Sequence, residues 1–339
     1  MAVEDVQAWV EKRLHVRLQR GVAPELAIER VPTGLLGVDW VLDGGIPLGR
    51  IIEVWGMPKH GKTSLVLEWV REFLARDYPV FYFDLEHALD PALMRIHGVD
   101  PNQVYFPQAE EGEVLWGEDL FVLLMTLARS VDHGLFVIDS VPALLTRRML
   151  VDKDVNNLLS DSPGTVAQLL SKGLRALTGS GVLAKRRNTL VCINQLRQQI
   201  NAYHPSFVHP GGLALGYYAS VSLEVRRGEV YEDPETKEQN GHEVLVRCDK
   251  NKAGMAYRSA AIPLFYAIGF DRYADAVSTG VAVGVVDQRG SWLQWGDSRW
   301  QGRDRMAEAL AADPVLWDQF VAAVRQRMIK EADPVNAPA

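Results

Sequence analysis

The sequence is poor in cysteine and carries no excess of positive charge. Its two cysteines, Cys192 and Cys248, each lie within an apolar strand-like run, which excludes a disulfide framework and predicts buried thiols in a reducing compartment. The formal net charge of the 339 residues is −7, so no broadly basic surface is available to nucleic acid. Any contact with DNA therefore has to come from local loops.

Long apolar runs and internal repeats are also missing. No stretch approaches the roughly 20 apolar residues that a membrane helix needs, and the chain does not open with the pattern of a secretory signal peptide. We therefore expect a cytoplasmic protein without membrane contact. No repeat of about 20 to 50 residues is found, which argues against a solenoid. The hydrophobic share of 47% is enough for a large core.

Short apolar strands alternate with amphipathic helical stretches through the middle of the chain. The strands include RIIEVW, PVFYFD, GLFVID and NTLVCIN, and segments with helical periodicity separate them. This alternation predicts an α/β fold whose mostly parallel central sheet is covered by helices on both faces. From about Ser220 the strand-like segments follow one another without helices, so we expect antiparallel pairing there.

The same patterns divide the chain into four parts. An N-terminal helix, ending at Gly21, and its link occupy residues 1–30, and the large α/β core spans residues 31–268. Residues 269–330 are expected to form a small C-terminal α/β module that ends in helices. Residues 331–339 are polar, and we expect this tail to fray.

A glycine- and lysine-containing loop lies between the strand RIIEVW and an amphipathic helix. Gly56, Gly61, Lys62 and Thr63 have the spacing of a phosphate-binding P-loop, in the strand-to-helix context that the motif requires. In such a loop the backbone N–H groups converge on phosphate, the lysine reaches the β- and γ-phosphates, and the threonine holds Mg²⁺. A glycine-capped turn without a ligand is the alternative. The predicted phosphate-binding residues are Gly56, Met57, Pro58, Lys59, His60, Gly61, Lys62, Thr63 and Ser64.

Two acidic residues near strand ends are candidates for the remaining chemistry of a P-loop NTPase. Asp139 follows the apolar run LFVI and is expected to hold the hydrated Mg²⁺ together with Thr63. Glu86, at the end of FYFDLE, is expected to activate the attacking water. Asp84 is expected to point back into the sheet instead. The alternatives are a helix cap at Asp139 and a solvated loop acid at Glu86.

The strand NTLVCINQ ends in two amides, Asn194 and Gln195, which are placed to sense a γ-phosphate. The polar loop that follows has no apolar periodicity, and its cation and aromatic residues suit single-stranded nucleic acid, with nucleotide state ordering the loop. A second polar loop, with Arg147 and Arg148, follows Asp139. An ordinary surface loop is the alternative for both. The DNA-binding candidates after Gln195 are Arg197, Tyr203, Phe207, Gly211 and Gly212.

These residues belong to a longer set of segments that run in order from about residue 31 to the C-terminal module. The segments are VPTG, IPLGRIIEVWG, GKT, DLEHALDP, IHGVD, VIDSVPAL, INQLR, GGLAL, YYASVSLEVRR and DKNKAG. In this set the sequence resembles the bacterial RecA recombinase family, which includes cellular and phage-borne members. EHALDP, INQ and KNK are specific to RecA-like proteins rather than to P-loop proteins at large.

The resemblance implies a function and a set of partners. It implies a DNA-dependent ATPase that uses Mg²⁺, forms helical filaments on single-stranded DNA and promotes pairing and strand exchange with homologous double-stranded DNA. Hydrolysis of ATP would release the DNA. Mediator and single-strand-binding proteins are further partners that the resemblance suggests, and the N-terminal helix resembles the arm that packs on the adjacent protomer.

Matching positions carry catalytic roles over from the resemblance. Lys62 would bind phosphate, Glu86 would activate water and Gln195 would relay the state of the γ-phosphate to the DNA-binding loop. Lys250 and Lys252, in DKNK, would reach the ATP of the neighbouring protomer as charge-stabilising cations. Without the resemblance, these two lysines are a charged turn between strands.

Further positions match the binding surfaces of the family. Asp90 would contact ATP, whereas Leu93 stands where the family has a tyrosine that stacks on adenine, which leaves the nucleotide preference open. Ser171 and Arg175 match helix positions that contact the DNA backbone, and Arg197 matches a loop contact.

Two other function classes share the nucleotide site. A hexameric RecA-fold motor such as a helicase would translocate as a closed ring, but the sequence contains KNK and lacks a separate primase-contact domain. A RecA-like paralogue with a regulatory binding role would not turn over ATP, but Lys62, Glu86 and Asp139 are all present. Ring or filament assembly discriminates the motor, and measured ATP hydrolysis discriminates the paralogue.

Overall fold

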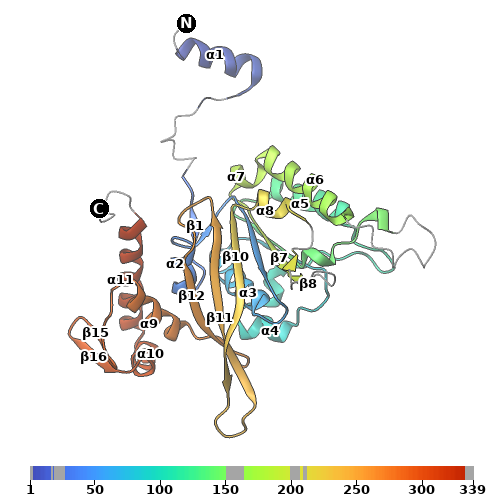
Figure 1. Cartoon of the computed structure of the whole chain (residues 1–339). Helices are drawn as coiled ribbons and strands as arrows, with labels where there is room; N and C mark the ends of the chain where they lie inside the picture. Colours follow the sequence, from blue (N-terminus) through green and yellow to red (C-terminus); the bar gives the residue numbers. More distant parts are fainter. Residues whose placement is uncertain are drawn as a thin grey trace.

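A single large sheet organises the part of the chain that the computed structural model describes. The described residues are 3–16, 18, 27–149, 164–198, 207–208 and 212–332. Within them, nine strands form the central sheet (Figure 1). From edge to edge these are β13 (Gly269–Phe270), β12 (Ser259–Phe265), β11 (Gln239–Asn251), β10 (Val221–Glu232), β3 (Ile51–Gly56), β7 (Thr189–Gln195), β6 (Leu135–Asp139), β4 (Val80–Asp84) and β5 (Val104–Tyr105). The strand before the glycine-containing loop, β3, is therefore an interior strand.

The sheet is parallel on one side and antiparallel on the other, as the sequence predicts. Strands β10, β3, β7, β6, β4 and β5 pair in parallel, whereas β10 to β13 pair antiparallel. In β4, Val80 and Tyr82 belong to one hydrophobic core, and Phe81 and Phe83 belong to another. Both faces of the sheet are buried, which explains why the parallel strands are apolar at nearly every position.

Helices cover both faces of the sheet and confirm the predicted α/β fold. One core is covered by α2 (Leu36–Val41), α3 (Lys62–Leu74) and α4 (Pro91–Ile96). The other is covered by α5 (Gly117–Ser130), α6 (Thr165–Ser180), α7 (Val182–Arg186) and α8 (Ala214–Tyr218). In α6 the buried residues Leu170, Leu174 and Leu177 recur at helical spacing, so one face of this helix packs on the sheet.

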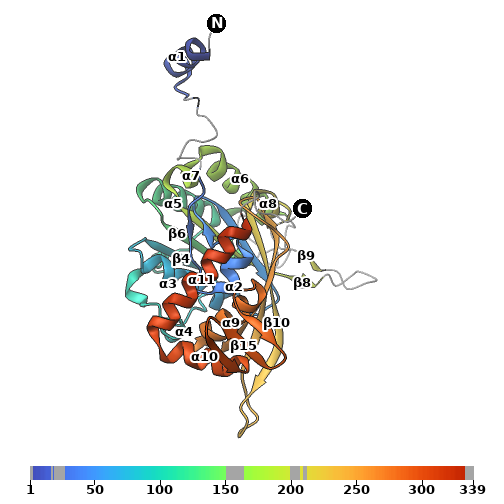
Figure 2. The ribbon, with the colours of Figure 1, turned by 90° about the vertical axis from the view of Figure 1, so that its left-hand side faces the viewer.

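Residues beyond the central sheet form a third core at its antiparallel edge. Its residues come from α9 (Arg272–Ala282), β15 (Trp292–Trp295), β16 (Ser298–Gln301), α10 (Arg303–Ala312) and α11 (Pro314–Ala332), and Figure 2 shows the three helices gathered together. β14 (Asp287–Arg289) pairs with β15 and is exposed. Leu36 of α2 is buried in the same core. A module boundary at residue 269 stays a prediction, because β13 still pairs with β12.

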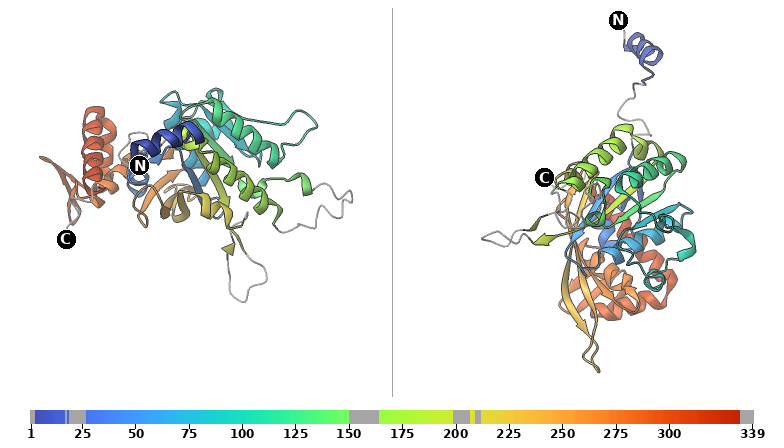
Figure 3. Two further views of the ribbon diagram at one scale, coloured as in Figure 1. Left: turned by 90° about the horizontal axis from the view of Figure 1, so that it is seen from above. Right: turned by 90° about the vertical axis from the view of Figure 1, so that its right-hand side faces the viewer.

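The N-terminal helix α1 (Val3–Leu14) lies apart from the sheet and its covering helices (Figure 3). The sequence pattern predicts that this helix continues to Gly21. It ends at Leu14 because His15 adopts a left-handed conformation, with a φ of 54°. Trp9 of α1 is 55% exposed. None of the described helices is long and apolar enough to cross a membrane.

One long antiparallel hairpin and two short antiparallel pairs account for several of the described strands. β10 and β11 pair over most of their length and project beyond the sheet (Figure 1), which carries side chains of both strands past the end of β3. Two small antiparallel pairs are β1 (Arg30–Val31) with β2 (Ile46–Pro47), and β8 (Arg197–Gln198) with β9 (Phe207–Val208). The second pair begins immediately beyond β7.

Two buried carboxylates lie where α2 meets α9. Asp275 accepts hydrogen bonds from the backbone N–H of Gly37 at 3.1 Å, and Asp39 accepts from the N–H and hydroxyl of Thr33 at 2.7 and 2.8 Å. Burial raises the pKa of Asp275 to about 7, helped by the charge of Asp39, and raises the pKa of Asp39 to about 6. Because the folded state favours the protonated acids, stability present at low pH is lost as pH rises toward 7.

We expect Asp275→Asn to flatten this pH dependence. The amide cannot ionise, so the free energy of unfolding should increase relative to the parent chain as pH rises from about 4 to about 7, by at most about 1.4 kcal/mol per pH unit. Urea unfolding across this range measures the difference. Asp297→Asn, in an exposed turn, is the matched control and should track the parent chain. If Asp275→Asn also tracks the parent chain, Asp275 is not a source of the pH dependence.

Candidate functional site

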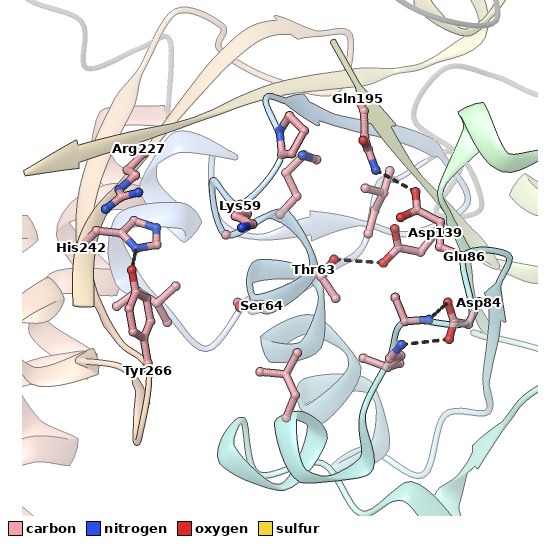
Figure 4. A pocket seen from close by; sticks show the side chains of 18 of the residues that line it. Lys59, Thr63, Ser64, Asp84, Glu86, Asp139, Gln195, Arg227, His242 and Tyr266 are labelled. Carbon is pink, nitrogen blue, oxygen red and sulfur yellow. Dashed lines mark hydrogen bonds between the residues drawn. The ribbon is translucent and has the colours of Figure 1, made fainter. Parts of the chain in front are cut away.

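The C-terminal ends of β3, β4, β6 and β7 open into a cavity of about 850 Å³ (Figure 4). One wall comes from the loop after β3 and the first turn of α3, and the opposite wall comes from β10, β11 and the end of β12. Polar side chains that line it include Lys59, Lys62, Thr63, Ser64, Asp84, Glu86, Asp139, Gln195, Arg227, Gln239, His242 and Tyr266. The sheet edge therefore collects charged groups that the interiors of its strands exclude.

The loop after β3 wraps around the amine of Lys62. Its Nζ donates hydrogen bonds to the carbonyl oxygens of Gly56 at 3.1 Å and Met57 at 2.8 Å. Gly56 is required because a Cβ there would collide with the carbonyl oxygen of Val225 in β10. Gly61 begins α3 in the left-handed region, with a φ of 90°. The glycines thus let the loop close tightly over the lysine.

Lys62 is a desolvated cation. Its residue is 6% exposed, and burial lowers the pKa of its amine to about 8, although the charges of Asp139 and Glu86 oppose this shift. A buried ammonium with only neutral carbonyl partners gains from any anion that reaches it. The N-terminus of α3 adds backbone N–H groups and a positive dipole end to the same place. This part of the cavity is suited to phosphate.

Asp139 and Thr63 form an oxygen pair next to the lysine. The Thr63 hydroxyl donates to Asp139 Oδ2 at 3.0 Å, and the Tyr82 hydroxyl donates to the same atom at 2.7 Å. Burial raises the pKa of Asp139, and the two hydroxyls oppose that rise. Among the described residues, no three metal-ligating side chains cluster. The pair fits Mg²⁺, which usually keeps several waters and takes few protein ligands.

Glu86 joins the ends of three strands. Its Oε1 accepts a hydrogen bond from Gln195 Nε2 at 2.7 Å and another from the hydroxyl of Ser140. Gln195 is the last residue of β7 and Ser140 follows the last residue of β6, while Glu86 follows β4. The exposed carboxylate therefore lies beside Asp139 in the lining of the cavity (Figure 4), and its charge acts on the amine of Lys62.

Two neighbouring polar residues behave differently from the expectations. Asp84 does not point back into the sheet; it lines the cavity, and its carboxylate accepts from the backbone N–H groups of Ala88 at 3.2 Å and Leu89 at 3.0 Å. It therefore fixes the loop that carries Glu86. Asn194 is buried, and its amide donates to Glu53 Oε1 at 3.1 Å, so only the second amide of the predicted pair faces the cavity.

Some of the remaining predicted nucleotide-binding residues line the cavity, and others do not. Asp90 is exposed and caps α4 by accepting from the N–H of Ala92 at 2.7 Å, whereas Leu93 of the same helix lines the cavity. His60 faces β10, with Nδ1 3.3 Å from the carbonyl oxygen of Val225. Of the predicted phosphate-binding residues, the lining contains Pro58, Lys59, Gly61, Lys62, Thr63 and Ser64.

Lys250 and Lys252 lie at the end of β11, against α8. Lys250 Nζ donates to the carbonyl oxygen of Gly216 at 2.5 Å, and Lys252 Nζ donates to that of Tyr217 at 3.1 Å. Burial and the neighbouring Lys252 lower the pKa of Lys250. Neither lysine is among the residues that line the described cavity. Their roles at a nucleotide stay predictions.

The predicted DNA-binding positions on α6 lie one helical turn apart. Ser171 is half-buried and Arg175 is exposed. Gly212 has a φ of 70°, and a Cβ built there would lie 3.1 Å from the Cβ of Ala167 in α6. The end of the loop after β9 thus lies against the N-terminal half of the helix that carries both candidates.

The loop candidates after β7 are only partly described. Arg197 and Phe207 lie in the paired strands β8 and β9, where Arg197 pairs with Val208. Tyr203 and Gly211 lie outside the described residues. Gln195 is the last residue of β7, and a single residue separates it from β8, so the hairpin begins next to Gln195 in the chain.

Several residues were not foreseen from the sequence, namely two that hydrogen-bond to the cavity acids, Tyr82 and Ser140, and four that line the cavity. Tyr82 and Ser140 are close in sequence to Asp84 and Asp139, and a search for hydroxyls beside the strand-end acids would have found them. Arg227, Gln239, His242 and Tyr266 carry no such signal. They reach the cavity because β10, β11 and β12 stack in order beside β3, and this pairing is set by contacts distant in sequence.

Comparison with known proteins identifies one family. A family model described as RecA N-terminal domain matches residues 2–271. A protein RecA from Fusobacterium nucleatum subsp. nucleatum is 34% identical over 97% of this chain and 85% of its own length. Proteins RecA from Thermus thermophilus and Bifidobacterium longum are 35% and 34% identical, over 96% and 94% of this chain and 94% and 78% of their own lengths.

Proposed function

This chain belongs to the RecA family, and from that premise we propose that it is a DNA-dependent ATPase that acts in homologous recombination. ATP assembles the protomers into a filament on single-stranded DNA, the filament pairs with homologous duplex and exchanges strands, and hydrolysis releases the DNA. The observation that supports this proposal best is the hydrogen bond between Glu86 and Gln195. It joins a candidate catalytic base to the residue from which the predicted DNA-binding loop begins.

In this proposal the phosphates of ATP occupy the loop after β3. Lys62 exchanges its two carbonyl acceptors for phosphate oxygens, and their negative charge raises its pKa from about 8, so the amine stays charged. Thr63 and Asp139 hold Mg²⁺, which when bound neutralises charge on the β- and γ-phosphate oxygens. Tyr82 keeps the Asp139 carboxylate oriented.

Glu86 and Gln195 have different proposed roles at the γ-phosphate. Glu86 accepts a proton from the attacking water, and Ser140 holds its carboxylate in position. Gln195 donates to the γ-phosphate while that group is present and returns to Glu86 after the phosphate leaves. Because β8 follows Gln195 by one residue, the two positions of this side chain bias the loop between β8 and β9.

The proposed contacts in the filament involve α1 and the two lysines at the end of β11. α1 exposes Trp9 and Val3, at 55% and 75%, which suits packing on the next protomer. Lys250 and Lys252 lie outside their own cavity and are proposed to reach the γ-phosphate of a neighbour. The DNA backbone is proposed to lie along α6 and the hairpin of β8 and β9.

Action of the lysines across the interface predicts complementation. We mix Lys250→Ala protomers with Glu86→Gln protomers, each inactive alone in this account, and measure ATP hydrolysis on single-stranded DNA. Mixed filaments contain interfaces that pair an intact Glu86 with an intact Lys250, so activity should recover to about a quarter of the parent rate, since random mixing of two inactive variants leaves one interface in four intact. No recovery at any ratio would count against action in trans.

The proposal as a whole predicts ATP hydrolysis that depends on DNA and fades with salt. Single-stranded DNA should raise the turnover rate at least about tenfold, because assembly on DNA completes the site. The logarithm of DNA affinity should fall linearly with that of salt concentration, by about 0.7 for each neutralised phosphate. Colorimetric phosphate release during a salt titration measures both effects, and electron micrographs of the same samples should contain open filaments.

Glu86→Gln is the matched variant for this measurement. It keeps the acceptor oxygen for Ser140 but cannot take a proton, so turnover should fall by about 10²- to 10⁴-fold while filaments on DNA persist. Turnover that ignores DNA in the parent chain would contradict the proposal, absence of turnover would favour the regulatory paralogue, and closed rings would favour the motor. Rapid hydrolysis by Glu86→Gln would remove Glu86 from the role of base.

A further inference from the structure

Buried polar atoms without a partner gather on the wall of the cavity that β10 and β11 supply. Among the described residues, Arg227 Nε, Asn240 Oδ1 and His242 Nε2 are buried and have no hydrogen-bond partner. Arg227 and His242 line the cavity, and His242 is 3% exposed. Buried donors in folded proteins nearly always have partners, so an unpaired group in a cavity wall points to a ligand.

A chain of hydrogen bonds leads from Gln239 through Tyr266 to His242. Gln239 Nε2 donates to the carbonyl oxygen of Gly241 at 3.4 Å, and a carbonyl can only accept, which identifies this atom as the amide nitrogen. The same nitrogen donates to Tyr266 Oη. The Tyr266 hydroxyl is then free to donate to His242 Nδ1, which lies 3.2 Å away. When the Tyr266 hydroxyl donates in this way, the proton of a neutral His242 resides on the unpaired Nε2.

The surrounding charges keep His242 neutral. Burial lowers the pKa of its imidazole, and the positive charges of Arg227 in β10 and of His60 in the loop after β3 lower it further. Tyr266 and Gln239 contribute hydroxyl and amide groups rather than charge. A neutral imidazole has one N–H, and here that N–H is the unpaired donor.

This wall lies across the cavity from Glu86 and adjoins the loop after β3 on its other side. In Figure 4, Arg227, His242 and Tyr266 are together on one side, while Thr63 and Glu86 are on the other. Next to His242 the lining is more apolar, with Leu264 and the half-exposed ring of Tyr266. If the phosphates of a nucleotide occupy the loop after β3, its base and sugar extend toward this wall.

We propose that His242 recognises the nucleoside half of the bound nucleotide. Its Nε2–H donates to a hydrogen-bond acceptor on the base or the sugar, and Arg227 Nε supplies a second donor beside it. Gln239 and Tyr266 are positioning residues that hold the imidazole in the donating tautomer. This inference rests on the proposed ATP site, and it names His242 as the residue that selects the nucleoside. Leu93 lines the same cavity at the position where the resembled family has an aromatic ring.

Calorimetric titration of the full chain with Mg²⁺–ATP and Mg²⁺–tripolyphosphate tests the inference. His242→Phe keeps a ring and removes the donor, so its Kd for ATP should rise about 5- to 10-fold, while its Kd for tripolyphosphate, which has no nucleoside, stays unchanged. Tyr266→Phe keeps the ring but frees the tautomer, and should weaken ATP about 2- to 3-fold. His133→Phe, at a histidine stacked on Tyr78 and not among the cavity residues, is the matched control and should bind as the parent chain does.

Three ATP analogues identify the acceptor. 7-Deaza-ATP and 3-deaza-ATP each lack one ring nitrogen, and 2′-deoxy-ATP lacks one hydroxyl. One of them should bind the parent chain about 5- to 10-fold more weakly than ATP and should show no such deficit with His242→Phe. Equal ATP affinity of His242→Phe and the parent chain, an equal loss for tripolyphosphate, or identical analogue deficits in both proteins would overturn the inference. A parent chain that binds neither ATP nor tripolyphosphate would overturn the ATP site itself.

Discussion

One carboxylate, that of Glu86, ties together the ends of three parallel strands. It accepts from Ser140 after β6 and from Gln195 at the end of β7, while Asp84 at the end of β4 holds the loop on which it lies. Buried strands are mostly apolar, so most of the polar groups of the parallel strands lie where the strands leave the core. The cavity, its hydrogen bonds and the start of the β8–β9 hairpin all follow from this constraint.

The cavity holds charged groups whose burial is only partly compensated by their neighbours. Burial lowers the pKa of Lys62, and the charges of Asp139 and Glu86 oppose this shift. Burial raises the pKa of Asp139, and the hydroxyls of Tyr82 and Thr63 oppose that rise. A triphosphate with its metal ion would replace these partial compensations with full ones. On the opposite wall, His242 Nε2 is buried without a partner among the described residues, and we propose that it donates to the bound nucleoside.

Local sequence was sufficient for the strands, for the glycine-containing loop between β3 and α3, and for the meeting of Glu86, Asp139 and Gln195. The three residues meet because the ends of neighbouring parallel strands lie together. Local sequence was insufficient for Asp84, whose direction depends on the backbone N–H groups of the loop that follows it. The wall with His242 was not foreseen because it depends on β11 pairing with β10, and β10 with β3, across many residues. Roles that need a second protomer or DNA, such as that of Lys250, stay predictions because one chain contains neither partner.

Gln195 is the proposed link through which the bound nucleotide changes the affinity for DNA. The direct measurement is the affinity for fluorescent single-stranded DNA with a non-hydrolysable ATP analogue and with ADP, in the parent chain and in Gln195→Ala. The account predicts that the analogue tightens binding at least about 10-fold in the parent chain and that this ratio falls to near one in the variant, with analogue binding retained. A Gln195→Ala chain that keeps the full ratio would contradict it.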